Sequence, residues 1–388
     1  MSKKKIFLVA LCLLIFPCSF IFSAPLFSHT WGFTLDLPVC YEFTGGDGRD
    51  QFSFENPDGA RFDIIIHHTL DGGAAPFPSV EALAQDVHTR LRNNGNIDFF
   101  VYRGKNAALI ELSFMLPGAG PMTGWALAIE LGQNPQTRGT RPKLLALAYG
   151  PAARQDLAIL HLSALDSLAP EIGDRHFPGP ITEYSFPRTK RVQMPVFGLG
   201  IYAWVFEEDA EAAQALIERE FNVLRRHEHR ADWQEAWSRY YRAIYRDSFD
   251  RLVDIAFQVE RYFNVPAREK RDFAEQVLHW VQSFTYERDF TGSDFVNAIS
   301  AAIEGRGDCD SRAMLWAVVL QQAGIPAAIM VSREFSHAMG LADVPGWGAR
   351  FEVGGQRLLV AETTANVGIG LIEESVSIID YWLGILFE

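Results

Sequence analysis

Cysteine and positive charge are both scarce in this sequence. Four cysteines occur in 388 residues, with neither a paired-cysteine motif nor a His-Glu-x-x-His motif, and these are the usual sequence signatures of zinc sites. We therefore expect no metal and no cofactor. Lysine and arginine number 35 against 48 acidic residues, which gives a net charge of −13. This excess of acid argues against a nucleic-acid-binding protein.

The sequence is rich in apolar and aromatic residues. Hydrophobic residues make up 48% of the chain and aromatic residues 13%, a composition that a disordered protein would lack. A chain of 388 residues is longer than one compact domain usually is, so two or three domains are expected. We predict a globular protein with well-packed cores.

The first 24 residues are typical of a secretory signal peptide. Three lysines at positions 3–5 precede an apolar run from Ile6 to Phe22, and Ala24 suits the last position before a cleavage site. Retention of this segment as a membrane anchor is the alternative, and Cys18 raises the option of a lipoprotein. We expect export to the periplasm, the cell envelope or the extracellular space. Only Cys40 and Cys309 then remain, and free thiols are favoured over one bridge.

Residues 25–170 show the pattern of an α+β domain with an antiparallel sheet. Trp31 to Leu37 alternate between apolar and polar residues as a half-buried strand does, and Ser79 is a suitable N-cap for a helix. A second predicted helix closes the block near Pro170. Six further strands are predicted, at residues 51–55, 60–67, 97–103, 107–115, 123–131 and 143–149. The element order, with an opening strand that ends at Leu37-Pro38, resembles the PsbP/Mog1-like sandwiches.

Residues 171–230 are predicted to be a linker followed by a helix. Residues 171–205 are rich in proline and glycine and show no sustained period, as an interdomain connection would. A helical stripe begins at Asp209 and ends in a basic stretch that contains His227 and His229, which suits a helix C-terminus. We interpret these two histidines as a solvated helix end rather than a metal site.

Residues 231–388 contain the side chains that suggest chemistry. Cys309 directly precedes a predicted helix over residues 311–323, and a helix N-terminus favours the thiolate form of a cysteine. Asp308 and Asp310 oppose that effect unless they cap the helix or face solvent. His337 begins a predicted strand downstream. A helix-start cysteine, a histidine on an adjoining sheet and an acid that orients the ring make up a thiol acyl-transfer site. The alternative is a buried structural cysteine.

The same region resembles the transglutaminase-like superfamily of papain-type thiol enzymes. The matching strings are Phe284-Thr285-Tyr286, residues 307–313 around Cys309, residues 324–327, His337-Ala338 and Glu362-Thr363-Thr364. The resemblance implies a papain-like fold, a helix bundle with an antiparallel sheet, in which Cys309 is the nucleophile, His337 the general base and acid, and Glu362 the residue that orients the imidazole. The family more often has Asp at the third position and Trp where this chain has Met339.

A second acid competes for the place beside His337. A simple meander that turns at Pro345-Gly346 and at Gly354-Gly355 would put Glu352, rather than Glu362, next to the histidine. The choice between these two glutamates stays open from the pattern alone. The last segment, residues 371–387, carries three acids within an apolar run, so we expect it to dock on the catalytic unit rather than span a membrane.

These observations predict an exported thiol-dependent acyl-transfer enzyme that acts on amide bonds of peptides, proteins or peptidoglycan peptides. Hydrolysis is favoured over crosslinking, because nothing in the sequence indicates an amine acceptor. The competing hypothesis is a non-catalytic envelope binding or scaffolding protein that keeps the fold of a thiol enzyme, with an envelope protein as its partner.

Overall fold

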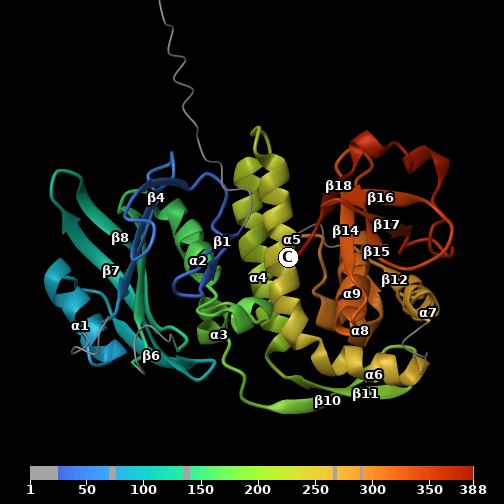
Figure 1. Cartoon of the computed structure of the whole chain (residues 1–388), viewed down its shortest axis with the longest axis horizontal. Coiled ribbons are helices and arrows are strands. Elements are labelled where there is room, and N and C mark those ends of the chain that lie inside the picture. Colours follow the sequence, from blue (N-terminus) through green and yellow to red (C-terminus); the bar gives the residue numbers. More distant parts are fainter. Residues whose placement is uncertain (1–24, 70–75, 134–139, 265–268, 289–291, 388) are drawn as a thin grey trace, which may run out of the picture.

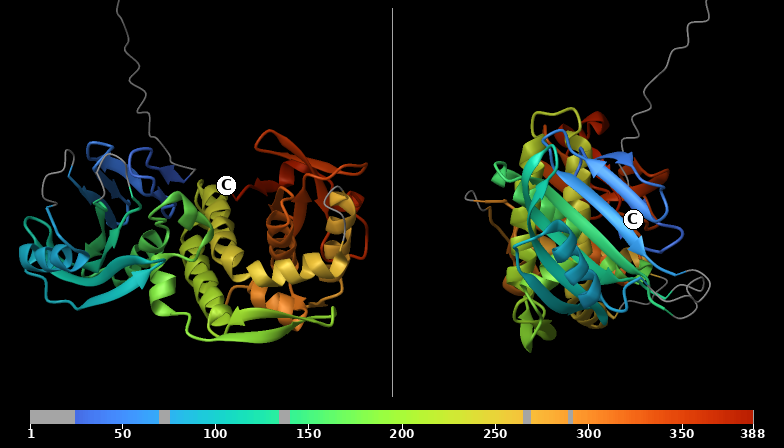
Figure 2. Two further views of the ribbon diagram at one scale, coloured as in Figure 1. Left: turned by 60° about the horizontal axis from the view of Figure 1, so that its bottom comes forward. Right: turned by 90° about the vertical axis from the view of Figure 1, so that its left-hand side faces the viewer.

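The computed structural model describes residues 25–69, 76–133, 140–264, 269–288 and 292–387. The predicted signal peptide lies outside these ranges. The described chain is mixed α+β with several antiparallel sheets. In Figures 1 and 2, helices α4 (Asp209–Leu224) and α5 (Trp233–Arg251) stand between a large N-terminal sheet and a smaller C-terminal one.

The N-terminal sheet has seven antiparallel strands in the order β3-β4-β5-β9-β8-β7-β6. Alternate side chains along β7 face two different cores: Leu109 packs with α2, and Ile110 packs with α1. The sheet is therefore covered by one helix on each face, as Figure 1 shows. The elements are β3 (Glu42–Gly45), β4 (Gln51–Glu55), β5 (Arg61–His67), α1 (Val80–Leu91), β6 (Ile97–Tyr102), β7 (Lys105–Leu116), β8 (Gly120–Glu130), β9 (Lys143–Pro151) and α2 (Ala158–Asp166).

The opening strand is shorter than the alternation predicts. Trp31, Phe33 and Leu35 are buried as expected, but only β2 (Thr34–Leu35) is a strand, paired with β1 (Leu26–Phe27) outside the main sheet. Gly32 has a φ of +77°, a backbone conformation that interrupts an extended strand. The hairpin of β4 and β5 and the four strands β6 to β9 confirm the prediction.

The prediction of an irregular linker over residues 171–205 is wrong in its second half. The chain there forms a two-stranded hairpin of β10 (Arg191–Val196) and β11 (Ile201–Phe206). Val196, Ala203 and Val205 are buried in the C-terminal core. Alternate residues of this short hairpin therefore face the core. The stretch before the hairpin contains a short 3₁₀ turn and α3 (Pro180–Ser185).

The C-terminal core surrounds one central helix, α9 (Cys309–Gln322). Every α9 residue from Ser311 to Leu320 is buried, so this helix is buried on all sides rather than on one face. A five-stranded antiparallel sheet, in the order β16-β17-β15-β14-β18, packs beside it. The sheet strands are β14 (Ala327–Ser332), β15 (His337–Ala342), β16 (Arg350–Val353), β17 (Gln356–Ala361) and β18 (Leu383–Ile385); the other helices are α6 (Val253–Phe263), α7 (Lys270–Gln282) and α8 (Ala298–Glu304).

The last segment docks on this core. Strand β18 pairs with the edge of β14, and the ring of Phe387 stacks on Tyr245 of α5 with centroids 4.1 Å apart. Ile385 is buried. The prediction that residues 371–387 pack onto the C-terminal unit is thereby confirmed. No helix in the described ranges is long and apolar enough to cross a membrane.

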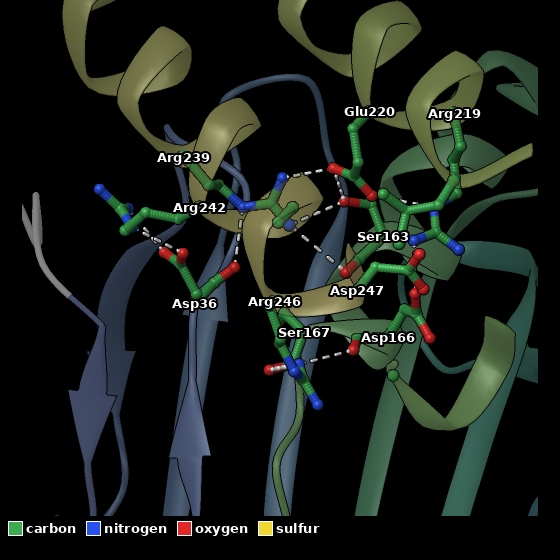
Figure 3. A pocket seen from close by; sticks show the side chains of 13 residues that line it. Asp36, Ser163, Asp166, Ser167, Arg219, Glu220, Arg239, Arg242, Arg246 and Asp247 are labelled. Carbon is green, nitrogen blue, oxygen red and sulfur yellow. Dashed lines mark hydrogen bonds and ion pairs between the residues drawn. The ribbon is translucent and has the colours of Figure 1, made fainter. Parts of the chain in front are cut away.

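A buried polar network, shown in Figure 3, joins the N-terminal sheet to α4 and α5. Arg239 of α5 donates to Glu220 of α4 at 2.5 Å, to Ser163 of α2 at 2.9 Å and to the carbonyl of Asp36 at 2.8 Å. Arg246, two turns further along α5, caps the carbonyls at the C-terminus of α2. The cavity at this joint holds about 40 Å³, so it has room for water rather than for an organic ligand.

Candidate active site

Cys309 is the first residue of α9. Asp308 is the N-cap, and its carboxylate accepts from the backbone N–H of Ser311 at 2.9 Å. The short strand before it, β13 (Arg306–Gly307), pairs in parallel with β12 (Thr285–Tyr286). A β-carbon at Gly307 would lie 2.8 Å from the Ser311 side chain, so glycine lets the chain turn tightly into the helix. The prediction of a helix-start cysteine is confirmed, and its thiol is free and buried.

His337 is brought to Cys309 by the packing of β15 on α9. A β-carbon at Gly340 would lie 2.4 Å from the ring of Trp316, so strand and helix are in close contact at these two residues. Trp316 is seven helical residues beyond Cys309, and Gly340 is three strand residues beyond His337; both separations correspond to about 10 Å. The backbone N–H of Ala338 also bonds the Cys309 sulfur. Among the described residues, however, no hydrogen bond joins the thiol to the His337 ring.

Glu362 holds His337. Its Oε2 lies 2.7 Å from Nε2 of the ring, which leaves Nδ1 for the cysteine side. Its Oε1 accepts from the backbone N–H of Thr364 at 2.7 Å and from the Thr364 hydroxyl at 2.6 Å. Burial opposes ionisation of Glu362, but these hydrogen bonds outweigh it and keep the pKa of the carboxyl below its usual value.

The structure separates Glu352 from His337. Strand β17, which ends one residue before Glu362, pairs with β15 through Ala361 and Gly340. Strand β16, which carries Glu352, lies on the far side of β17. Glu352 is exposed and stands opposite Arg357. The chain from Asp343 to Ala349 is a wide loop rather than a tight turn, so the simple meander behind the Glu352 alternative does not form.

The electrostatics at Cys309 differ from the sequence-based expectation. Burial raises the pKa of the Cys309 thiol well above its ordinary value, and the carboxyls of Asp310 and Asp308 add to the rise. Hydrogen bonds from Ala338 and Tyr286 act in the opposite direction but are smaller. The helix N-terminus alone therefore does not produce a resting thiolate, and the thiol is neutral at rest.

Asp310 is itself perturbed. Burial and the neighbouring Asp308 raise the pKa of the Asp310 carboxyl to about 8. The hydroxyl of Tyr241 on α5 donates to its Oδ1 at 2.5 Å, and its Oδ2 lies 3.9 Å from the Cys309 sulfur. Near neutral pH this carboxyl is mostly protonated, so much of the negative charge that would oppose a thiolate is absent.

Three further residues lie near the site, although the sequence analysis assigned none of them a role there. The ring of Trp382, from the C-terminal segment, lies 6.2 Å from that of His337. The Tyr286 hydroxyl interacts with the Cys309 sulfur because β12 pairs with the strand before the cysteine. Arg312, one turn into α9, donates to the carbonyls of Gly307 and Phe284. The string Phe284-Thr285-Tyr286 was the signal for Tyr286, and the string over residues 307–313 was the signal for Arg312; Trp382 had none.

An apolar groove of about 460 Å³ runs beside α5. We call it the aromatic groove; it is lined by Phe221, Leu224, Arg225, Glu228, Trp233, Trp237 and Arg333. The guanidinium of Arg333 lies 5.7 Å from the Trp233 ring. Along α5 the ring of Trp237 is 6.3 Å from that of Tyr241, whose hydroxyl bonds Asp310. The buried ring of Tyr241 thus connects the groove, through Trp237, to the residue next to Cys309.

Two groups of side chains in the described ranges have metal-ligand atoms within 4.8 Å of one another. One is Asp308, Cys309 and Asp310, where the carboxylates are already engaged by Ser311 and Tyr241. The other is Cys40, His227 and Asp232. His227 is buried, so the interpretation of this histidine as part of a solvated helix end is wrong: the turn after α4 folds against the Cys40 loop.

Comparisons with known proteins give remote likenesses only. No family model and no curated protein matches the chain. Among solved structures, cyanobacterial PsbP from Synechocystis is 12% identical, with a TM-score of 0.27 over 38% of this chain and 91% of that one. LpqN, involved in cell envelope biogenesis of Mycobacterium tuberculosis, is 10% identical, with a TM-score of 0.26 over 38% and 88%. Calcium-bound LapG of Legionella pneumophila is 14% identical, with a TM-score of 0.22 over 42% and 79%. Scores this low leave the function to the geometry of the site.

Proposed function

We propose that this protein is an exported thiol-dependent acyl-transfer enzyme that hydrolyses amide bonds in peptides or proteins, peptidoglycan peptides included. The observation that carries the proposal is the arrangement around His337. Glu362 takes Nε2 of the ring at 2.7 Å, and Cys309 lies beside the first residues of the same strand. A nucleophile, a base and a group that orients the base are the three parts that thiol acyl transfer needs.

The first chemical step forms an acyl-enzyme. The Cys309 sulfur attacks the substrate carbonyl carbon while its proton passes to Nδ1 of His337, and the oxyanion accepts a hydrogen bond from the Cys309 backbone N–H at the helix start. The C–N bond then breaks, and the amine leaves with the proton from His337. The thiol is neutral at rest, so the proton transfer accompanies the attack. Glu362 stabilises the imidazolium that forms.

The second step releases the acid. Water attacks the thioester carbon and gives a proton to His337, the C–S bond breaks, and the sulfur regains the proton from the imidazolium. Nothing else is consumed, so the balance is one amide and one water to one acid and one amine. An amine in place of water would give crosslinking by the same steps.

The aromatic groove is the place where we propose that the substrate chain lies. Its walls are three aromatic rings and Leu224, with two arginines and a glutamate; the rings suit apolar side chains next to the scissile bond, and the charged groups suit polar atoms of a peptide. The contacts of Trp237 with Tyr241 and of Tyr241 with Asp310 support this position, because a peptide bound on this side of α5 would extend toward Cys309.

We also propose a separate role for each part of the chain. Residues 231–388, completed by the hairpin of β10 and β11, form the catalytic unit with a papain-like, transglutaminase-like arrangement. Residues 25–170 form a PsbP/Mog1-like positioning module, and residues 171–230 connect the two. The packing of Val196 and Val205 into the C-terminal core supports the assignment of the hairpin to the catalytic unit.

A non-catalytic scaffold is the second candidate, and one observation favours it. Cys309 is only 4% exposed and its pKa is raised, as expected for a structural cysteine. On this hypothesis the partner is an envelope protein, and the histidine and glutamate form a structural hydrogen bond only.

Acylation by p-nitrophenyl acetate separates the two candidates without knowledge of the substrate. An acyl-transfer enzyme should release a burst of one equivalent of nitrophenol, with the acetyl group found on Cys309 by mass spectrometry. The burst should be lost in His337→Ala and kept in Glu352→Gln, the exposed control. Equal and slow acetylation of Cys309 and Cys40, unchanged by His337→Ala, would establish the scaffold. Cleavage of a peptide library would then define the scissile bond.

A further inference from the structure

A second cysteine, histidine and aspartate come together at the joint between the N-terminal sheet and α4. Cys40 lies in the loop between β2 and β3, and His227 and Asp232 lie in the turn between α4 and α5. The Cys40 sulfur is 3.7 Å from Nδ1 of His227 and 3.1 Å from Oδ2 of Asp232. Nδ1 of His227 is 3.1 Å from Oδ1 of Asp232. One ligand atom from each of the three side chains thus lies within 4.8 Å of the other two.

This geometry differs from that of a thiol-enzyme triad. In such a triad the acid and the cysteine occupy opposite nitrogens of the ring, whereas here both approach Nδ1 of His227. In this orientation the ring therefore cannot transfer a proton between Cys40 and Asp232 through its two nitrogens. Convergence on one point is the arrangement of metal ligands instead. With Zn–S near 2.3 Å and Zn–N or Zn–O near 2.1 Å, tetrahedral geometry separates the donors by about 3.5 Å; the sulfur and Nδ1 are 3.7 Å apart, and each lies 3.1 Å from one oxygen of the Asp232 carboxylate.

The backbone and the burial at this cluster add independent support. Cys40 has a φ of +79°, within a turn closed by the N–H of Tyr41 and the carbonyl of Pro38. Glycine is the usual residue at such a position, so a cysteine there indicates a side chain that is needed. His227 is only 3% exposed. A cavity of about 130 Å³ adjoins Cys40 and Asp232, which leaves room for an ion and a water ligand.

We propose that Cys40, His227 and Asp232 bind a thiophilic divalent cation, with zinc the best fit, through three protein ligands and a water. Thiolate, imidazole and carboxylate together suit zinc, whereas calcium and magnesium take oxygen ligands. The bound ion ties the N-terminal loop to the turn that opens α5, and so holds the Trp233 end of the aromatic groove. Arg230, whose Nε is 3.4 Å from Asp232, opposes the cation and weakens its binding. This site does not depend on the proposed function.

Zinc binding to the full chain tests the proposal. The protein is stripped with a chelator, dialysed against Zn²⁺ alone, and analysed for bound metal. We expect one zinc per chain in the wild type and in Cys309→Ser, and an affinity weaker by on the order of 100-fold or more in Cys40→Ser and His227→Ala, because each change removes a ligand. Arg230→Gln should bind zinc several-fold more tightly, because it removes a repulsive charge.

Alkylation of the wild type gives a readout that needs no variant to fold. Zinc should protect Cys40, but not Cys309, from iodoacetamide, and a chelator should restore the labelling. Three results overturn the proposal: no stoichiometric zinc in the wild type, zinc retained at full affinity by folded Cys40→Ser, or zinc lost from Cys309→Ser and kept by Cys40→Ser. The last of these would place the metal at Asp308, Cys309 and Asp310.

Discussion

The molecule holds two sets of cysteine, histidine and carboxylate that differ in how the acid meets the ring. At Cys309, the Glu362 carboxylate takes Nε2 of His337 and leaves the other nitrogen to the sulfur. At Cys40, the Asp232 carboxylate and the sulfur both approach Nδ1 of His227. The same three residue types thus suit proton transfer in one place and metal binding in the other. Ring orientation, not composition, decides which chemistry a constellation supports.

Both thiols also have a raised pKa, so neither forms a thiolate–imidazolium ion pair at rest. Burial, with hydrogen bonding and charge from Asp232, raises the pKa of Cys40 to about 12. Burial, with Asp310 and Asp308, raises the pKa of Cys309 still further above its ordinary value. On the proposed mechanism, His337 takes the proton of Cys309 when a substrate arrives. At Cys40 the carboxylate accepts the thiol proton, so only a cation that replaces that proton would ionise the sulfur.

The largest expected effect is on the first of the two sets. Cys309→Ser should lower the rate of acyl transfer by about 10⁴-fold or more, because the hydroxyl is a far poorer nucleophile and holds its proton much more tightly than a thiol. The nitrophenol burst and peptide cleavage both measure this loss. Circular dichroism serves as the control for folding. An active Cys309→Ser protein would show that the reacting group lies elsewhere, and the comparison between the two cysteines would lose its basis.

The joint beside the second set provides the next prediction, on stability. Arg239→Ala removes the strongest partner of Glu220, a carboxylate that is only 1% exposed, although Arg219 still pairs with it at 2.9 Å. Breaking a buried ion pair on one side costs about 3 kcal/mol at the low end. Urea unfolding should show this loss. The exposed pair of Arg154 and Asp156 is the matched control, and Arg154→Ala should cost much less stability than Arg239→Ala because solvent screens the exposed pair. Equal losses of unfolding free energy would mean that the buried ion pair stabilises the protein no more than the exposed one does.

Glu362→Gln tests the acid that distinguishes the first set. The amide keeps the size of the side chain but cannot stabilise the imidazolium, so kcat should fall by about 10²- to 10³-fold with a smaller change in KM. Glu352→Gln, on the outer strand β16, is the control and should leave kcat unchanged. If both variants behave alike, His337 does not depend on a carboxylate, and its bond to Glu362 is structural.

Much of the fold could be predicted from periodicity. The strands β4 to β9 and the helices α1 and α4 follow from apolar spacing and from caps such as Ser79, which accepts from the N–H of Ala82. The errors fall where local and tertiary effects compete. The β10 to β11 hairpin was missed because proline and glycine mask its alternation, and the opening strand was overextended because alternating burial does not require a strand.

The candidate site could be predicted in its residues but not in its electrostatics. The helix start at Cys309 and the strand start at His337 follow from local pattern, and the Glu362 string contains the acid that bonds His337. Burial of the thiol, the protonation of Asp310 and the ring of Trp382 depend on packing among distant segments, which no local pattern encodes. The Cys40 cluster was missed for the same reason, since nearly two hundred residues separate Cys40 from its partners.

The smallest and most specific effect concerns Asp310, which has no counterpart in the Cys40 set. Its pKa is raised from 3.8 to about 8, so it is neutral below pH 8 and ionised above, where its charge, 3.9 Å from the sulfur, opposes the developing thiolate. The rate constant of the chemical step should therefore fall a few-fold as the pH rises through 8, and Asp310→Asn should remove that fall. Stability provides a second readout: the folded chain holds this proton more tightly than the unfolded chain, so the free energy of unfolding decreases as pH rises between these two pKa values. Asp310→Asn should abolish that part of the decrease, whereas the exposed Asp380→Asn should not. A rate profile in Asp310→Asn that matches the wild type above pH 8 would show that the charge beside Cys309 does not control its reactivity.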